Sequence, residues 1–427
     1  MSLYATDPDR VVLLGESARV KLQNAFISLI FLTSFYVSIE PAVCDLVFFF
    51  CLALFYRSGL KITPAIMPLM AMLILYNVGG ILSYMKVRDD LDYGSYRFVF
   101  TTFYMSLSGI FIAAYIAEAP AKHYLLIMRA YWTGATIAAI LGLIGYFHFT
   151  SLSAYFTMND RATGGFKDPN VFSTYLVLPA VGMLQALALG TIKRSPFNFL
   201  RVGIILMGLF LAFSRGAWVN IVLSTGLMML FTFFLAPTLR ARTSIAFSAI
   251  AAIAAVIVMI IFLMSIPEVR FLFLDRLTLV KNYDAGETGR FGNQLNSIPL
   301  LLQYPLGLGP YQFAEIFREN PHNSFVNAFS SFGWLGGITY LAMVSSNLYI
   351  GLRTIFKRTA FQPYAITAYS CLVAVSFQAV QIDTEHWRHL WWIIGLNWGF
   401  FAASQIAAKR EPRANELDCW QPTVAQI

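Results

Sequence analysis

The segment IAFSAIAAIAAVIVMIIFLM (residues 245–264) decides the class of fold. It carries no charged residue, and a helix needs about 20 mostly apolar residues to cross a bilayer. Similar apolar runs, such as residues 25–36 and 204–213, recur along the chain. Of the 427 residues, 58% are hydrophobic and 12% are charged, whereas a soluble domain carries about 25% charged residues. The sequence therefore predicts an integral membrane protein and excludes an ordinary soluble domain.

The apolar runs predict an all-α polytopic fold with twelve transmembrane helices. We expect these spans near residues 22–39, 41–56, 64–85, 98–117, 123–148, 171–190, 197–213, 216–235, 243–266, 323–351, 361–380 and 388–407. The chain then divides into an N-terminal segment (1–21), nine spans (22–266), one long loop (267–321), three spans (322–407) and a C-terminal tail (408–427).

The loops between these spans alternate in charge. One set, which includes both termini, holds seventeen basic and seven acidic residues, and the other holds twelve basic and fifteen acidic residues. Because loops rich in Lys and Arg stay in the cytoplasm, we expect cytoplasmic termini and an opposite, periplasmic face. The net charge of +8 is thus a topology signal. No basic patch interleaved with aromatic residues indicates nucleic-acid binding.

The N-terminus and the cysteines narrow the class further. Residues 1–21 are polar, so we expect no cleavable signal peptide. The four cysteines are scattered and predict neither a disulfide framework nor a metal site; they are Cys44, Cys51, Cys371 and Cys419. We therefore expect no cofactor and no metal.

The long loop, about 55 residues from Pro267 to Pro321, is too polar to span. Loops of this length are usually functional. Residues 293–304 predict a short amphipathic helix on the membrane surface. The following Pro305-Leu-Gly-Leu-Gly-Pro310 predicts a tight turn in which small residues let the backbone approach a ligand.

Polar residues gather at the periplasmic ends of the spans rather than at their centres, where coupled transporters place them. The first group, residues 159–170, ends in Asp168-Pro169-Asn170. This pattern fits a helix cap with a turn or a substrate-positioning loop.

The second group is Ser214-Arg215-Gly216-Ala-Trp218, between two spans with almost no loop. Its arginine either extends to the lipid headgroups or binds phosphate in a bidentate manner. The third group centres on Arg290, which by residue type alone is a solvated loop arginine.

The fourth group, Pro321-His322-Asn323-Ser324, opens the tenth span. His322 is a candidate general base near neutral pH, and the alternative is a helix-entry cap formed by Asn323 or Ser324. Two weaker groups remain. Asp89, Asp90 and Asp92 form a solvated loop or a cation site, and residues 383–389 form a structural network or line the site.

The order of these groups resembles the superfamily of O-antigen ligases and Wzy-type polysaccharide polymerases. The resemblance rests on Gly-Phe-Lys-Asp-Pro-Asn (165–170), Ser-Arg-Gly-Ala-Trp (214–218), Arg290 ahead of Pro305-Leu-Gly-Leu-Gly, His322-Asn-Ser-Phe and Gly333-Trp-Leu-Gly336, and it is firmest over residues 160–340. One departure is Gln294 and Leu295, where many members place an aromatic residue.

The resemblance implies a GT-C-like, metal-independent, inverting glycosyltransferase in the bacterial inner membrane. It implies an undecaprenyl-diphosphate-linked glycan as donor and a glycan acceptor, with a chain-length regulator or a flippase as further partners. By position, Arg215 and Arg290 engage the diphosphate and His322 activates the acceptor hydroxyl. The candidates for substrate contact are Arg161, Lys167, Asp168, Asn170, Arg276, Tyr311, Asn323 and Glu385.

Three functions remain open from the sequence. A repeat-unit polymerase is favoured over a ligase that transfers finished polysaccharide to lipid A–core. A polysaccharide flippase or exporter predicts related halves and polar residues at mid-membrane, and the chain shows neither.

Overall fold

The computed structural model describes residues 8–87, 94–277 and 289–410. Four parts of the expected organisation therefore lie outside the described residues: residues 1–7 of the N-terminal segment, the Asp89–Asp92 acidic run, residues 278–288 of the long loop and most of the C-terminal tail.

The described chain is almost entirely helical, with one two-stranded antiparallel ribbon and two short 3-10 helices. In chain order the elements are α1 (Pro8–Thr33), α2 (Val43–Ser58), η1 (Pro64–Ile66), α3 (Met67–Tyr84), α4 (Ser95–Glu118), α5 (Pro120–Tyr146), η3 (Ser153–Phe156), β1 (Thr157–Met158), β2 (Arg161–Ala162), α6 (Pro169–Tyr175), α7 (Val177–Leu189), α8 (Pro196–Leu211), α9 (Arg215–Leu235), α10 (Leu239–Met264), α11 (Pro267–Leu277), α12 (Arg290–Gln303), α13 (Phe313–Phe317), α14 (Ser324–Ile355), α15 (Gln362–Gln378) and α16 (Arg388–Arg410).

Each of the twelve predicted spans falls on a helix or a helix pair of this list. Within the described residues, seven segments are long and apolar enough to cross a membrane: 64–84, 95–118, 120–146, 169–189, 215–235, 239–264 and 324–355. Residues 43–55 and 196–211 form shorter apolar helices. The all-α, multi-pass membrane class follows from these segments, and the count of twelve spans stays a prediction.

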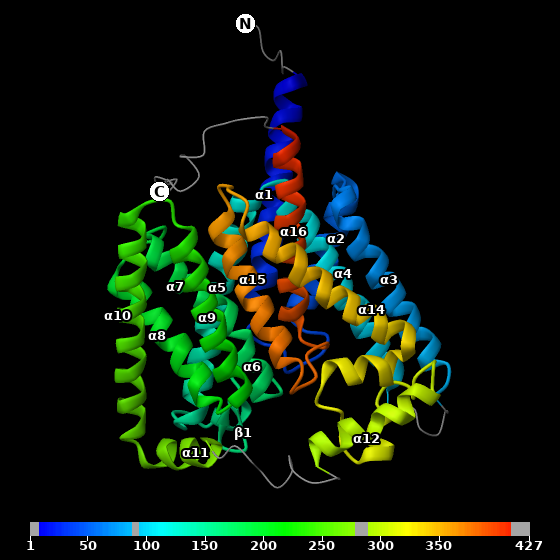
Figure 1. Ribbon diagram of the computed structural model, residues 1–427. Coiled ribbons are helices and arrows are strands. Elements are labelled where there is room, and N and C mark those ends of the chain that lie inside the picture. Colours follow the sequence, from blue (N-terminus) through cyan, green and yellow to red (C-terminus); the bar gives the residue numbers. More distant parts are fainter. Residues whose placement is uncertain (1–7, 88–93, 278–288, 411–427) are drawn as a thin grey trace, which may run out of the picture.

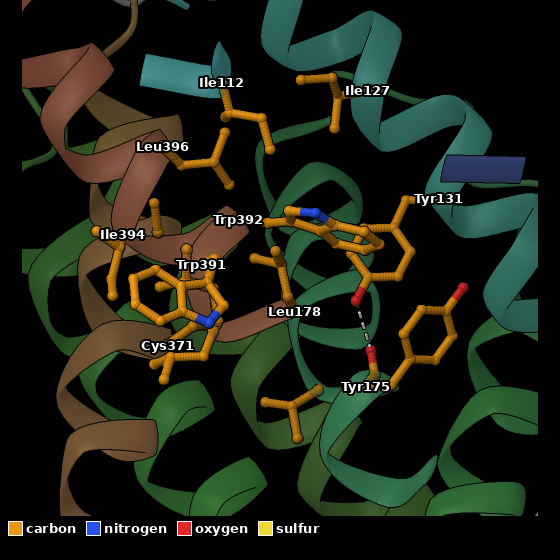
Figure 2. Packing of buried hydrophobic residues seen from close by; sticks show 14 of the residues in the cluster. Ile112, Ile127, Tyr131, Tyr175, Leu178, Cys371, Trp391, Trp392, Ile394 and Leu396 are labelled. Atoms are coloured by element: carbon orange, nitrogen blue, oxygen red, sulfur yellow. Dashed lines mark hydrogen bonds between the residues drawn. The ribbon is translucent and has the colours of Figure 1, made fainter. Parts of the chain in front are cut away.

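The core is centred on α16, which lies in the middle of the bundle (Figure 1). Its Trp392 ring packs edge-on against Phe31 of α1, with ring centroids 4.7 Å apart, and also contacts Tyr131 of α5. Figure 2 shows the Trp392 and Tyr131 rings together with Cys371 and Leu178, and the Tyr131 hydroxyl donating to the Tyr175 carbonyl at 2.9 Å. Side chains from distant segments thus meet around one helix.

Glycines let α4 and α16 approach closely. A Cβ on Gly395 would lie 2.5 Å from the Gly109 carbonyl oxygen, and one on Gly399 would lie 2.6 Å from the Ile116 side chain. Small residues at helix contacts are typical of membrane bundles, where close backbone packing replaces the hydrophobic effect between helices. By contrast, α10 exposes most of its apolar side chains at the edge of the bundle (Figure 1), as a lipid-facing helix does.

The start of α1 and the end of α16 lie at one end of the bundle, whereas β1, α11 and α12 lie at the other (Figure 1). The second end carries the turn before α9, the beginning of α14 and the connection from α15 to α16. The candidate groups therefore gather at one end of the molecule.

Candidate functional site

The beginning of α14 is held by Asp383, in the connection between α15 and α16. The Asp383 carboxylate accepts the backbone N–H of His322 at 3.2 Å and that of Asn323 at 2.8 Å. The Asn323 side chain caps α14 by accepting from the N–H of Phe325 and Val326. The predicted helix-entry cap is confirmed, and it holds the backbone of His322 beside a carboxylate.

The predicted amphipathic helix is α12, which begins at Arg290, and it reaches the same segment. Its Gln294 donates to the Pro321 carbonyl at 2.8 Å and accepts from Asn323 Nδ2 at 3.4 Å. Arg290 lies four residues earlier, on the same helix face. Gln294, which departs from the family pattern, therefore fastens the arginine-bearing helix to the histidine segment.

The other face of α12 is apolar and exposed. It presents Phe291, Leu295, Ile298 and Leu302 outward, while Asn293, Ser297 and Leu301 are buried against the protein. This pattern is that of a helix whose apolar side enters the headgroup region of a bilayer. The helix thus turns its polar face to the candidate site.

Two carboxyl groups lie close together in the α15–α16 connection. Burial and the neighbouring Glu385 charge raise the pKa of Asp383, while its two backbone hydrogen bonds and Arg290 lower it. Burial likewise raises the pKa of Glu385, opposed by a hydrogen bond from Asn327. Like charges this close do not both ionise readily, so the pair retains a proton more readily than exposed carboxyls do.

These carboxyl groups line a pocket of about 140 Å³ at the end of the bundle. Its walls are Phe98, Tyr311, Phe313, Asn320, Asn327, Asp383, Glu385 and His386. Burial and the adjacent Arg388 charge lower the pKa of His386 to about 4. The His386 imidazole is therefore uncharged at neutral pH. It lines the pocket and forms a hydrogen bond with the Thr102 hydroxyl.

Arg215 is the first residue of α9, directly after Ser214, whose hydroxyl caps the helix by accepting from Ala217 N–H. Next to it, Gly216 leaves room for Gln378, because a Cβ there would lie 3.2 Å from the Gln378 amide nitrogen. Asn220 donates to the same glutamine at 2.6 Å. Gln378 ends α15, so the start of α9 is fixed beside the helix that leads to Asp383.

The 159–170 group mainly braces this turn. Arg161 donates to the Ala212 carbonyl at 2.8 Å and to the Asn170 side chain at 3.0 Å. Asp168 caps α6 by accepting from the N–H of Asn170 and Val171. Lys167 forms an exposed ion pair with Glu40 at 3.3 Å. The structure shows the cap and turn, and substrate contact by these four residues stays a prediction.

Arg276 lies on α11, on the far side of the undescribed 278–288 segment from α12. Its Nε atom is buried and has no hydrogen-bond partner in the part of the chain that the structure describes. A substrate contact by Arg276 stays a prediction. Within the described residues, no group of three or more His, Cys, Asp or Glu side chains has the arrangement of a metal site.

The turn at Pro305–Pro310 packs against the backbone of α14 through Gly307, and its approach to a ligand stays a prediction. A Cβ on Gly307 would lie 2.7 Å from the Ser330 carbonyl oxygen of α14. That carbonyl accepts from the N–H of Leu308, and the Trp334 N–H donates to the Pro305 carbonyl, each at 2.8 Å. The turn therefore satisfies the groups released where α14 is broken at Gly333.

Asp383, Asn327 and Gln294 were not among the candidates for substrate contact from the sequence. The available signal was weak: Asp383 and Glu385 are two carboxylates, one residue apart, between two apolar helices. Their tie to His322 depends on a contact across about sixty residues. Sequence spacing does not report such a contact.

The apolar helices define a multi-pass membrane protein. Residues 200–341 match the family model described as O-antigen ligase, which confirms, over that part of the chain, the resemblance to the superfamily of O-antigen ligases and Wzy-type polymerases. The match covers about a third of the chain and contains Arg215, Arg290 and His322. No curated protein matches the sequence.

Proposed function

We propose that this protein transfers a glycan from a polyprenyl-diphosphate carrier to a sugar hydroxyl at the periplasmic face of the bacterial inner membrane. The observation that carries the proposal is the junction at Asp383. Its carboxylate holds the backbone of the candidate base His322, and its pKa responds to the charge of the candidate phosphate ligand Arg290. The segment that carries the candidate base and the helix that begins at the candidate cation are thus held together, through Asp383 and through the hydrogen bond from Gln294 to the Pro321 carbonyl.

The chemistry follows from the bonds that change. Transfer breaks the bond between the anomeric carbon and the diphosphate, so negative charge grows on the leaving group. Fixed cations at that position stabilise the transition state more than the ground state. Arg290 and Arg215 supply such cations, and a bidentate guanidinium suits phosphate. His322 accepts the proton of the attacking hydroxyl, and this single displacement inverts the anomeric configuration.

The lipid carrier explains the position of the site. The donor has a polyprenyl tail in the bilayer and a charged diphosphate at its surface. The exposed apolar face of α12 lies at this boundary in our proposal, so Arg290 meets the diphosphate as the lipid arrives from the side. A chain-length regulator or a flippase is a partner of the same pathway.

We favour a repeat-unit polymerase, in which the growing chain moves from one carrier onto the next lipid-linked unit. The second candidate is a ligase that moves finished polysaccharide to lipid A–core, the activity after which the matching family is named. Both reactions use the same donor chemistry and the same proposed arginines. They differ in the acceptor.

Deleting the gene and sizing the lipid-linked and surface glycans tests the proposal and separates the two reactions. Loss of a polymerase leaves single repeats, whereas loss of a ligase leaves long chains on the lipid carrier. Normal surface glycan of normal length in the deletion strain would contradict both. In purified protein we expect activity to survive EDTA, and a full loss would favour a cation at Asp89–Asp92 instead.

A further inference from the structure

The side chains that line the pocket beside Asp383 differ from those of a phosphate-binding site. Two carboxyl groups, Asp383 and Glu385, line it, and among the residues that the structure describes no arginine or lysine does. An anionic diphosphate would be repelled by these carboxyls. The pocket is therefore chemically separate from the proposed diphosphate ligands, although Asp383 joins it to the His322 segment.

Its walls combine aromatic rings with hydrogen-bonding groups. Phe98 and Tyr311 pack edge to face, with ring centroids 5.1 Å apart, and Phe313 adds a third ring. Opposite polar groups come from Asn327 and Glu385. Apolar walls with a few placed polar groups are typical of small-ligand sites. A pyranose ring matches this pattern, because its C–H face is apolar and its hydroxyls donate and accept.

One atom of the pocket lacks a partner. Glu385 is only 2% exposed, and one of its oxygens accepts from Asn327. The other oxygen, Oε2, has no hydrogen-bond partner among the described residues. Buried polar atoms are nearly always hydrogen-bonded, so this oxygen is a place where a ligand hydroxyl can bind.

We propose that this pocket binds the acceptor sugar, a neutral pyranose whose hydroxyls contact Glu385 and Asn327 and whose ring packs against Tyr311. The inference rests on the proposed glycosyl transfer and specifies its acceptor. A neutral sugar is required because a uronic acid would bring a carboxylate against Asp383 and Glu385. Because Asp383 lines this pocket and also holds the backbone of His322, the bound sugar lies next to the segment of the candidate base in this proposal.

The test is sugar binding by the full-length protein in detergent, measured by saturation-transfer difference NMR. The probes are the methyl glycosides of glucose, galactose, mannose, N-acetylglucosamine and glucuronic acid. We expect at least one neutral glycoside to bind and the glucuronide not to bind. Glu385→Ala should weaken binding at least about tenfold, and Glu385→Gln should restore most of it, because an amide still offers an oxygen and a donor.

Tyr311→Ala provides a variant that leaves the buried Asp383 and Glu385 unchanged, since the Tyr311 side chain is 40% exposed. Its matched control is Tyr304→Ala, another exposed tyrosine of the same loop, at 48%, which does not line the pocket. We expect weaker sugar binding in the first variant and unchanged binding in the second. In transfer assays Tyr311→Ala should raise KM for the acceptor while kcat changes little.

Two outcomes overturn the subsite: no neutral glycoside binds to the wild-type protein, or binding is the same in Glu385→Ala and Tyr311→Ala. Either result leaves the proposed function intact if glycan transfer still depends on His322. Conversely, loss of the proposed function would appear as transfer that is independent of His322, whatever the sugar-binding result.

Discussion

His322 lies in the left-handed region of backbone space, at φ 48°. This conformation costs a residue with a side chain roughly 1–2 kcal/mol, and it persists because the surroundings fix it. Asp383 holds the N–H groups of His322 and Asn323, and Gln294 binds the carbonyl just before them. The candidate base is therefore fixed by its backbone before any substrate arrives.

The carboxyl pair predicts a pH dependence of stability. The pKa values of Asp383 and Glu385 are raised in the folded protein by burial, and for Asp383 also by the charge of Glu385. In the unfolded chain they lie near the ordinary value of about 4. The folded state then binds protons more tightly, so the pair's contribution is full at low pH and is lost as pH rises through the raised pKa values.

We expect the melting temperature of the wild-type protein in detergent to fall as pH rises from about 5. Glu385→Gln removes one of the two charges and should reduce this fall, because Asp383 then ionises without a like charge beside it. Lys167→Gln, at an exposed ion pair, is the control and should keep the wild-type dependence. Identical pH profiles for wild type and Glu385→Gln would argue against a coupled pair.

For single residues, the sequence was most informative where a motif contained a side chain with a specific chemistry. Arg215 and His322 stood out because their chemistry suits diphosphate and hydroxyl groups, whereas Arg290 was singled out by the family resemblance. The sequence did not single out Asp383, because this carboxylate accepts from the backbone N–H groups of His322 and Asn323, and backbone groups leave no residue pattern in the sequence. Asp168 and Asn323 had two interpretations, and the structure shows that each caps a helix.

The helix α14 is broken at Gly333, where φ is 65°. The break is held by the 305–310 turn, whose backbone bonds the freed groups at Ser330 and Trp334. A Cβ on Gly333 would lie 2.6 Å from the Leu306 carbonyl carbon. Glycine is thus required twice at this position, once for its backbone angle and once for space.

Gly333→Ala should lower the free energy of unfolding by at least about 2 kcal/mol, from left-handed strain and the clash together. The expected result is a lower melting temperature and reduced transfer, since the turn leads from α12 to His322. Gly226→Ala is the matched control, because nothing lies within 4 Å of the added Cβ. An unchanged melting temperature in Gly333→Ala would show that the break is not needed.

The helices were predictable from the sequence where the composition of a segment alone determines its secondary structure. Long apolar runs must form helices in a bilayer, because no water satisfies the backbone there, and each predicted span falls on a helix. The division of residues 169–189 into α6 and α7 was not predicted. The contact of Gly307 in the 305–310 turn with α14 was not predicted either, because it is visible only once both segments are placed.

A buried ion pair connects distant parts of the whole molecule. Arg388, at the start of α16, donates to both carboxylate oxygens of Asp45 in α2, at 2.8 and 2.6 Å. Tyr104 of α4 donates to the same carboxylate. Three helices, α2, α4 and α16, are thus joined at Arg388, two residues after His386, which lines the pocket.

Asp45→Ala leaves the Arg388 guanidinium buried without its partner, which typically costs about 3–5 kcal/mol. We expect a much lower melting temperature in detergent. Glu40→Ala breaks the exposed pair with Lys167 and should change stability by less than about 1 kcal/mol. Equal effects of the two substitutions would contradict a structural role for the buried pair.

The most direct measurement is glycan transfer by the purified full-length protein, supplied with a polyprenyl-diphosphate-linked oligosaccharide and an acceptor. We expect His322→Ala and Arg290→Ala each to lower the transfer rate by at least about a hundredfold, while both variants keep the wild-type melting temperature. Transfer at the wild-type rate by both variants would contradict a site at His322 and Arg290.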